Sequence, residues 1–238
     1  MPQVFNIVIM GPPGAGKSTQ AEAIASRYGL SRLSTGDMVR DEIKKDSPLS
    51  QKLREIVARG DMAPESLIYK LVAQNLSSAD NKNGFILDGF PRNETQARWL
   101  DKFMKKNGMK INTVVEIAVK DQEIITRICG RFSCSECDET YHITHKQPEK
   151  ENECDSCGAE DSFQRRADDN QGVVRNRIEI YKKTTADVLA YYKNTARLKT
   201  VDGSQPVPAV GKEIIKLLDG LRPSGKPAYA DKYKRKGL

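Results

Sequence analysis

The chain has 238 residues, 38% apolar and 30% charged, which suits one α/β domain with an insertion or two small domains. No apolar run approaches the roughly 20 residues that span a bilayer, and the N-terminus lacks the basic segment of a signal peptide. These features argue against a membrane or secreted protein and predict a cytoplasmic one.

The net charge of +7 is concentrated near the C-terminus. The segment 222–238 contains one acid, Asp231, and the basic residues Arg222, Lys226, Lys232, Lys234, Arg235 and Lys236. It also contains prolines and glycines and has no apolar period, so we expect a disordered basic tail. Weak attachment to nucleic acid or to an acidic partner is the alternative, which we favour less.

Short apolar runs alternate with helix-length segments along the chain. We predict strands at 4–10, 31–34, 84–88, 112–119 and 197–202. Helical patterns occur at 17–28, 36–44, 49–58, 64–77, 92–106, 121–128, 168–193 and 208–219. This alternation is typical of an α/β fold, here a parallel five-stranded sheet with helices on both faces. Ligands of such sheets lie at the carboxyl ends of the strands.

The turn after the first predicted strand carries the most specific motif of the chain. Residues 11–18 read G-x-x-x-x-G-K-S between a strand and a helix, which is the pattern of a phosphate loop. The N–H groups of such a turn converge on phosphate oxygens, and the next helix directs its positive end at them. Lys17 adds a positive charge and Ser18 a hydroxyl for Mg²⁺. The motif predicts a nucleoside triphosphate site.

Two other strand ends carry related signals. Asp88 ends the strand predicted at 84–88, where an acid beside a phosphate loop can hold Mg²⁺ through its water shell, and Arg92 opens the next helix. The segment 34–40 is again a strand end, a glycine turn and a helix start, with Arg40 one turn into the helix. The alternative for Asp88 is a helix cap or turn residue, which is less favoured beside a phosphate loop.

Two stretches interrupt the alternation, a helical one at 35–63 and the segment 130–167, here called the cysteine insertion. Within the insertion, two C-x-x-C pairs are formed by Cys134, Cys137, Cys154 and Cys157. This spacing is a strong signal for a tetrahedral and therefore structural zinc site. Disulfides are the alternative, which a cytoplasmic location disfavours. His142 and His145 are less favoured alternative ligands, and Cys129 is expected to be a small buried residue.

Arginines gather at both ends of the cysteine insertion. Arg127 and Arg131 flank its start, and Arg165, Arg166, Arg175 and Arg177 lie at and after its end. A guanidinium matches the geometry of phosphate oxygens, so this arrangement suggests closure over a polyanion. A solvated helix face is a reasonable alternative for Arg165 and Arg175.

Together these motifs resemble the adenylate kinases that have a zinc-bearing lid. The matching residues are 11–20, 34–40, 87–92, Gln96, 127–131, the four cysteines, 141–142, 166–169 and Arg177. They place the resemblance over residues 4 to about 219. It implies a core like that of P-loop nucleoside triphosphate hydrolases at 1–33, 64–129 and 168–221, an insertion at 34–63 that binds the nucleoside monophosphate (NMP), and a zinc-bearing lid at 130–167.

The resemblance also implies residue roles. The ATP-binding residues would be Gly14, Ala15, Gly16, Lys17, Ser18, Thr19, Arg127, Arg131, Thr140, Tyr141 and Gln205. The AMP-binding residues would be Thr35, Arg40, Asp61, Met62, Ala63, Gly89, Phe90, Pro91, Arg92, Gln96, Arg166 and Arg177. The catalytic set would be Lys17, Arg40, Asp88, Arg92, Arg131, Arg166 and Arg177. Ser18 replaces a glycine of many relatives, and 61–63 replace a more usual Lys-Leu-Val-like triplet.

The implied reaction is ATP + AMP ⇌ 2 ADP with Mg²⁺, catalysed by a monomer without nucleic-acid or membrane partners. A kinase acting on UMP or CMP is the enzymatic alternative, against which Gln96 argues. A zinc-ribbon protein that binds nucleic acid is an alternative of another class, but residues 132–164 are rich in acids, which opposes it. A phosphate-loop switch protein would leave the second group of arginines unexplained.

Overall fold

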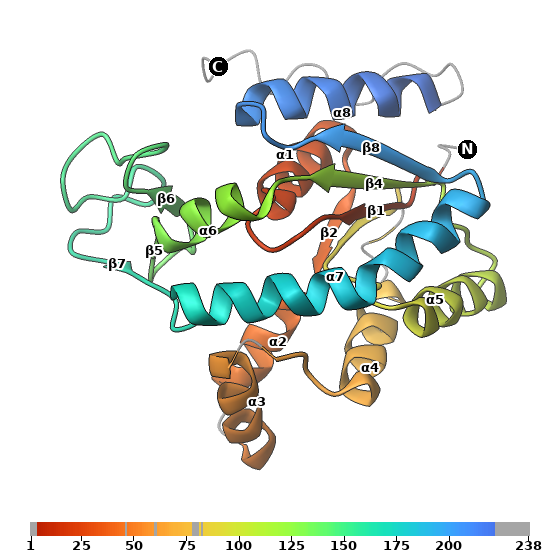
Figure 1. The fold of residues 1–238 in the computed structure, drawn as a ribbon, viewed down its shortest axis with the longest axis horizontal. Coiled ribbons are helices and arrows are strands. Elements are labelled where there is room, and N and C mark those ends of the chain that lie inside the picture. Colours follow the sequence, from red (N-terminus) through yellow and green to blue (C-terminus); the bar gives the residue numbers. More distant parts are fainter. Residues whose placement is uncertain (1–3, 46, 60, 78–80, 82, 222–238) are drawn as a thin grey trace.

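The computed structural model describes residues 4–45, 47–59, 61–77, 81 and 83–221. The expected tail at 222–238 lies outside the described residues. The predicted α/β fold is confirmed: a five-stranded parallel sheet has the order β2-β3-β1-β4-β8 (Figure 1). Its strands are β1 (Ile7–Met10), β2 (Ser31–Ser34), β3 (Phe85–Asp88), β4 (Thr113–Ala118) and β8 (Leu198–Asp202).

Helices cover both faces of this sheet, so the central strands β1 and β3 are buried along their whole length. On one face, α1 (Lys17–Tyr28) and α8 (Val207–Leu221) pack on Ile7 and Ile9. The other face, which includes Val8 and Met10, packs against α4 (Glu65–Leu76), α5 (Glu94–Lys106) and α7 (Gln171–Asn194). Alternate residues of a strand point to opposite faces, and a strand buried on both faces therefore reads as a continuous apolar run.

The stretch after β2 forms two helices that lie beyond the edge of the sheet. They are α2 (Thr35–Lys44) and α3 (Pro48–Arg59), which pack against each other (Figure 1). Ser34 caps α2, because its hydroxyl accepts a hydrogen bond from the Asp37 N–H at 3.2 Å. The chain then returns to the sheet through α4.

The cysteine insertion contains strands that the sequence pattern did not predict. After α6 (Asp121–Cys129), the strands β5 (Arg131–Cys134), β6 (Thr140–His142) and β7 (Phe163–Gln164) form an antiparallel sheet in the order β6-β5-β7. This small sheet projects from one end of the molecule (Figure 1). It has its own apolar cluster, separate from the clusters of the main sheet.

Most boundaries differ from the sequence expectation by one or two residues, and two differ by three. The first strand begins at Ile7 and not at residue 4. Helix α7 begins at Gln171 and not at 168, because Asn170 caps it by accepting a hydrogen bond from the Val173 N–H at 3.0 Å. Among the described residues, no helix has both the length and the apolar character needed to cross a bilayer.

Candidate active site

The phosphate loop connects β1 to α1 in a conformation that needs its glycines. Gly11 has φ 147°, and a Cβ there would lie 2.6 Å from the carbonyl oxygen of Ile117. Gly16 has φ 84° where α1 begins, a left-handed conformation that costs glycine little. The loop folds around Lys17, whose ammonium donates a hydrogen bond to the Pro12 carbonyl at 2.7 Å. The N-terminus of α1 and this ammonium therefore face the same space.

The carboxyl ends of three neighbouring strands meet beside this loop. The Ser18 hydroxyl donates to the Asp88 carboxylate at 2.7 Å, which joins the phosphate loop to the end of β3. The Thr35 hydroxyl donates to the Asp88 carbonyl oxygen at 3.3 Å, which brings in the start of α2. Asp88 is 4% exposed. A carboxylate and a hydroxyl held together here are oxygen ligands of the kind Mg²⁺ binds directly or through water.

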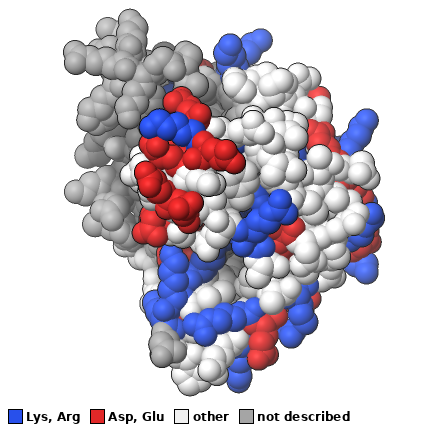
Figure 2. Space-filling model, turned by 90° about the vertical axis from the view of Figure 1, so that its left-hand side faces the viewer, with Lys and Arg blue, Asp and Glu red and all other residues white. Residues whose placement is uncertain are grey.

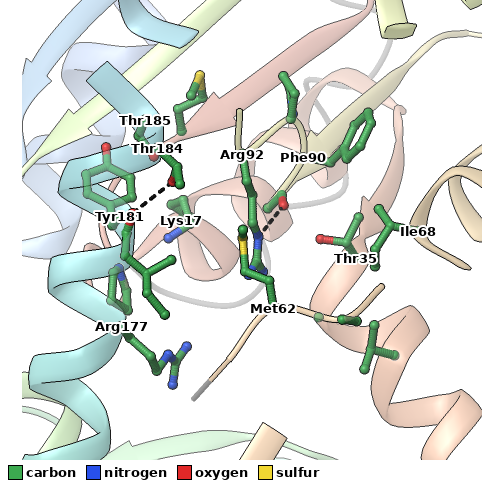
Figure 3. A pocket seen from close by; sticks show the side chains of 18 of the residues that line it. Lys17, Thr35, Met62, Ile68, Phe90, Arg92, Arg177, Tyr181, Thr184 and Thr185 are labelled. Atoms are coloured by element: carbon green, nitrogen blue, oxygen red, sulfur yellow. Dashed lines mark hydrogen bonds between the residues drawn. The ribbon is translucent and has the colours of Figure 1, made fainter. Parts of the chain in front are cut away.

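A cleft opens in front of these strand ends (Figure 3). The space in front of the strand ends amounts to about 1280 Å³ when its opening to solvent is included. The expected site residues that line it are Lys17, Thr35, Arg40, Asp61, Met62, Ala63, Gly89, Phe90, Pro91, Arg92, Gln96 and Arg177. Residues far apart in the sequence thus share one cavity.

The cleft concentrates positive charge. Lys17, Arg92 and Arg177 come from three different segments and point into the same space (Figure 3). Loss of hydration together with the nearby arginines lowers the pKa of Lys17 to about 8, against an opposing effect of Asp88. Burial and the charge of Arg177 likewise lower the pKa of Arg92. Cations crowded in this way favour a polyanionic ligand, which would relieve their repulsion.

Arg166 and Arg131 extend this charge toward the cysteine insertion. Burial and the charges of Arg131 and Arg40 lower the pKa of Arg166 to about 10. Arg131 also lowers the pKa of Lys17. Neither Arg131 nor Arg166 lines the cleft. These two cations lie near the cleft residues, at its border with the insertion.

Acidic side chains hold three of these arginines in fixed positions. Arg131 forms a two-pronged pair with Asp169, with N···O distances of 2.8 and 2.5 Å, and the Asp169 side chain is 2% exposed. Arg177 donates to Asp168 at 2.6 Å. Arg40 is paired with Asp37. The guanidinium groups are therefore positioned before any ligand arrives, which reduces the ordering cost of binding.

Four further residues expected to contact ATP, Arg127 and Gln205 at its adenine and Thr140 and Tyr141 from the lid, lie outside this cleft. Arg127 donates to the Gly203 carbonyl oxygen at 2.9 Å, two residues before Gln205, so these segments are neighbours. The Gln205 side chain donates to Asp202 at 3.4 Å. The Thr140 hydroxyl donates to the Asp138 carbonyl at 3.4 Å. Tyr141 is 1% exposed and pairs with Phe132 in the small sheet, so it offers almost no surface to a ligand in this conformation.

The four cysteines of the insertion come together as two matching turns. The N–H of Asp138 donates to the Cys134 carbonyl at 3.0 Å, and the N–H of Gly158 donates to the Cys154 carbonyl at 2.7 Å. Asp138 and Gly158 both have positive φ, at 59° and 72°. Each turn presents two sulfur atoms, and all four lie within 4.8 Å of one another.

The distances between these sulfur atoms fit a metal site and exclude disulfides. Cys134 and Cys157 lie 3.7 Å apart, and Cys137 and Cys154 lie 3.6 Å apart. A disulfide is about 2.05 Å long. Four sulfur atoms placed about 2.3 Å from one zinc ion in a tetrahedron would be about 3.8 Å apart. The cluster therefore has the geometry of a Cys₄ metal site.

The surroundings of the cluster lower the pKa of two of its thiols, Cys134 and Cys154, and raise the pKa of the other two. The Tyr141 hydroxyl hydrogen-bonds to the Cys154 sulfur at 3.4 Å and helps to lower the pKa of that thiol to about 6. Burial has the opposite effect on Cys137 and raises its pKa to about 12. Four adjacent thiolates therefore need a cation among them.

The two histidines of the insertion lie outside this cluster of sulfur atoms. His142 is 9% exposed, and its Nδ1 accepts hydrogen bonds from the N–H groups of Thr144 and His145 at 3.1 and 3.2 Å. Cys129 is partly buried against the apolar cluster around α6. Both placements are consistent with structural roles.

Sequence reasoning missed several cleft residues on α7. Tyr181, Thr184 and Thr185 line the cleft together with Arg177 (Figure 3). They follow Arg177 by four, seven and eight residues, which places them on the same face of the helix. Once Arg177 is assigned to the site, this spacing would have identified them.

The surface charge bears on the nucleic-acid alternative. Figure 2 shows the side of the molecule on which the cysteine insertion lies, and acidic side chains gather in its upper part. The exposed acids of the insertion are Glu136, Asp138, Glu149, Glu151, Asp155, Glu160 and Asp161. A nucleic-acid-binding module is expected to be basic around its metal, so this surface opposes that alternative.

Comparisons with known proteins agree with these features. A model of the adenylate kinase family matches residues 9–197. An adenylate kinase of Archaeoglobus fulgidus is 37% identical over 218 residues, which cover 92% of this chain and 100% of that protein. Adenylate kinases of Carboxydothermus hydrogenoformans and Enterococcus faecalis are 40% and 37% identical, and each match covers 90% of this chain and 99% of the relative. The chain therefore belongs to the adenylate kinase family.

Proposed function

We propose that this protein catalyses the reversible, Mg²⁺-dependent transfer of a phosphoryl group from ATP to AMP, which yields two ADP. The observation that carries the proposal is the single cleft in which the phosphate-loop Lys17 faces Arg40, Arg92 and Arg177. These cations come from the phosphate loop, α2, the turn after β3 and α7, so they can hold phosphates from several sides, as two nucleotides placed phosphate to phosphate would require. The adenylate kinase relatives support the same reaction.

ATP would lie with its phosphates on residues 14–19 and its adenine between Arg127 and the segment 203–205. The hydrogen bond from Arg127 to Gly203 supports this placement, because it brings both walls together. AMP would occupy the opposite part of the cleft, against Thr35, residues 61–63, residues 89–92 and Gln96. The reacting phosphates would then meet at Lys17 and the arginines.

The chemistry needs no general base. The second pKa of a phosphate monoester is about 6, so the AMP phosphate is already a nucleophile at neutral pH. Catalysis is then the positioning of both phosphates and the stabilisation of charge by Lys17, Arg40, Arg92, Arg131, Arg166 and Arg177. The acids Asp37, Asp168 and Asp169 keep three of these arginines in place.

Ser18 and Asp88 would hold Mg²⁺, Ser18 directly and Asp88 through the water shell of the ion. Bound there, the ion would neutralise charge on the transferring phosphates. The 2.7 Å hydrogen bond between the two side chains supports this placement, since it puts both oxygens at one point beside the phosphate loop.

We propose that one zinc ion is held by Cys134, Cys137, Cys154 and Cys157. With four protein ligands the ion keeps no open position, so its role would be structural. Free cysteines so close together persist in a reducing compartment, which supports a cytoplasmic protein. We further propose that it acts as a monomer, with nucleotides as its partners and without nucleic acid or a membrane.

The segments 34–63 and 130–167 would close over the two nucleotides as an NMP-binding part and a lid. Closure excludes water, which would otherwise compete with AMP for the phosphoryl group. Arg131 and Arg166, at the border of the lid, would then join the cations of the cleft. This division leaves 1–33, 64–129 and 168–221 as the core.

A test of the reaction supplies ADP and Mg²⁺ alone and follows the products by chromatography. The proposal expects ATP and AMP in equal amounts, since the transfer is reversible. A hydrolase would give AMP or phosphate without ATP, and a switch protein would give neither, so both results would contradict the proposal. The enzymatic alternative is a UMP or CMP kinase. Such an enzyme would also make no ATP from ADP alone if it did not use AMP.

A further inference from the structure

Gln96 lies in the first turn of α5 and lines the cleft. Its side chain is held at several points, and the residue is 3% exposed. Asn93 caps the helix by accepting a hydrogen bond from the Gln96 N–H at 2.8 Å. The position of Gln96 is therefore fixed by the start of the helix, and the open question is which way its carboxamide faces.

Two hydrogen bonds answer this question. The carboxamide oxygen of Gln96 accepts from the Arg92 backbone N–H at 2.8 Å. Its nitrogen donates to a Glu65 carboxylate oxygen at 3.2 Å. The same Glu65 oxygen accepts from the Asn93 side chain at 2.6 Å, and Tyr69 lies 3.5 Å from the other oxygen. Glu65 is thus tied to three neighbours.

The chemistry of these partners allows only one orientation of the carboxamide. A backbone N–H only donates, and a carboxylate only accepts. If the Gln96 carboxamide were flipped, its NH₂ would face the Arg92 N–H and its oxygen would face the Glu65 carboxylate. Both hydrogen bonds would be lost and two like groups would be opposed in a buried place. Of the two partners, only Glu65 can be changed by substitution, because the other is backbone.

In the fixed orientation Gln96 keeps one acceptor position and one donor for a ligand. The oxygen has two lone pairs and uses one for Arg92, and the NH₂ group has two hydrogens and uses one for Glu65. A base that offers an exocyclic amino group beside an unprotonated ring nitrogen is complementary to this pair. Adenine offers that pattern, whereas a 6-oxopurine offers a carbonyl beside a protonated ring nitrogen.

We propose that Glu65 is a positioning residue that sets the base specificity of the monophosphate site by preventing the Gln96 carboxamide from flipping. The proposal rests on the proposed function in one respect, that the acceptor base contacts Gln96. Glu65 does not line the cleft and acts through Gln96. Its effect is selective: it disfavours 6-oxopurines and uracil, but not cytosine, whose amino group and ring nitrogen repeat the adenine pattern.

The experiment compares the dissociation constants of AMP, IMP and CMP for the wild type, Glu65→Gln and Glu94→Gln. IMP is the sharpest probe, because it differs from AMP only in this edge of the base. The glutamine introduced by Glu65→Gln keeps the shape of the side chain but can donate as well as accept, so residue 65 no longer opposes the flip of the Gln96 carboxamide and only the Arg92 N–H still does. Glu94 lies in the same helical turn as Gln96 and binds Arg98 instead, so its variant removes the same charge nearby.

Trp99 supplies a binding signal that does not depend on catalysis. It is the only tryptophan of the chain, and its ring lies 5.8 Å from that of Phe90, which lines the cleft. Fluorescence titration therefore gives the dissociation constants without ATP. The loss of negative charge at residue 65 changes the affinity for all monophosphates alike. Its effect therefore cancels in the ratios of their dissociation constants.

We expect the preference for AMP over IMP to fall by about tenfold in Glu65→Gln, within the range by which a bidentate contact discriminates bases. The ratio of the AMP and CMP dissociation constants should change less than about twofold in Glu65→Gln. Both ratios should be unchanged in Glu94→Gln. The proposal would be overturned if the ratio of the AMP and IMP dissociation constants were the same in all three proteins. It would also be overturned if Glu65→Gln lost its preference for AMP over CMP to the same extent, because that would indicate a general loosening of the site. Phosphoryl transfer is measured separately, so that its absence would contradict the proposed reaction and not the role of Glu65.

Discussion

Lys17 is the charged residue of the cleft whose state changes nearest to neutral pH. Its pKa is lowered to about 8 by lost hydration and by Arg92, Arg177 and Arg131. Bound phosphates would raise this pKa again. Below pH 8 the ammonium is already charged and ATP binding is insensitive to its titration, whereas above pH 8 binding must take up a proton. We therefore expect ATP affinity to fall above pH 8, by up to about tenfold per pH unit.

Calorimetric titration of ATP between pH 7 and 9.5, in buffers of different ionisation enthalpy, measures both the affinity and the proton uptake. The matched control is Lys17→Arg, whose guanidinium stays charged over this range. The control should bind ATP with little dependence on pH. Affinity of the wild type that is constant up to pH 9.5 would show that Lys17 does not carry the effect.

Some residues of the site could be predicted from the sequence and others could not. Lys17, Ser18 and Asp88 could be located in advance because each belongs to a short pattern of strand, turn and helix. Tyr181 and the acids Asp168 and Asp169 could not be assigned roles. Their importance comes from contacts with arginines and with a cavity, which depend on how α7 crosses the sheet. Glu65 was missed for the same reason, since its partner Gln96 lies on another helix.

At the scale of elements, we expect the cysteine insertion to depend on the proposed zinc ion for its stability. Its apolar cluster contains Tyr141, Phe132 and Phe163 but few other large side chains, and a core of this size is too small to be stable alone. We expect Cys154→Ser to lose the bound zinc and to expose the insertion to proteolysis. The main sheet should stay folded, because its apolar clusters are separate.

Metal analysis and limited proteolysis of the purified protein test this expectation. Cys129→Ser is the control, because Cys129 is a cysteine of the same region that lies outside the cluster. It should retain one zinc per chain and resist cleavage within 131–165. Full zinc content in Cys154→Ser, or equal cleavage of both variants, would contradict the role given to the cluster.

The strands of the cysteine insertion could not be predicted from the sequence. β5, β6 and β7 contain only two to four residues each, too few for an alternating pattern to be read. Their pairing, such as Arg131 opposite His142, joins residues that are distant in sequence. The tight turns of the cysteines bring these strands together, so their existence follows from contacts within the insertion and not from local propensity.

At the scale of the whole molecule, the main sheet could be predicted because its strands alternate with helix-length segments and because the central strands β1 and β3 are buried on both faces. The edge strands β2 and β8 are only partly buried, and the structure places all five strands in one parallel sheet. The order β2-β3-β1-β4-β8 was not predicted. It depends on which crossover passes over which strand, and the local sequence does not contain that information.

We also expect whole-molecule motion to limit the rate. If the cysteine insertion must open to release products, the turnover number should equal the opening rate and the chemical step should be faster. Relaxation-dispersion NMR on the insertion during turnover measures the opening, and rapid quench of a single turnover measures the chemistry. A chemical step slower than the opening would contradict this expectation.

The most direct test of the account is ADP formation from Mg·ATP with AMP, UMP, CMP, GMP or no acceptor, using zinc-loaded protein. The account predicts two ADP for each AMP consumed and little ADP without an acceptor. Transfer to UMP or CMP in preference to AMP would retain the fold and the arginine mechanism but would contradict Gln96 as the basis of specificity. No transfer to any acceptor would contradict the proposed function itself.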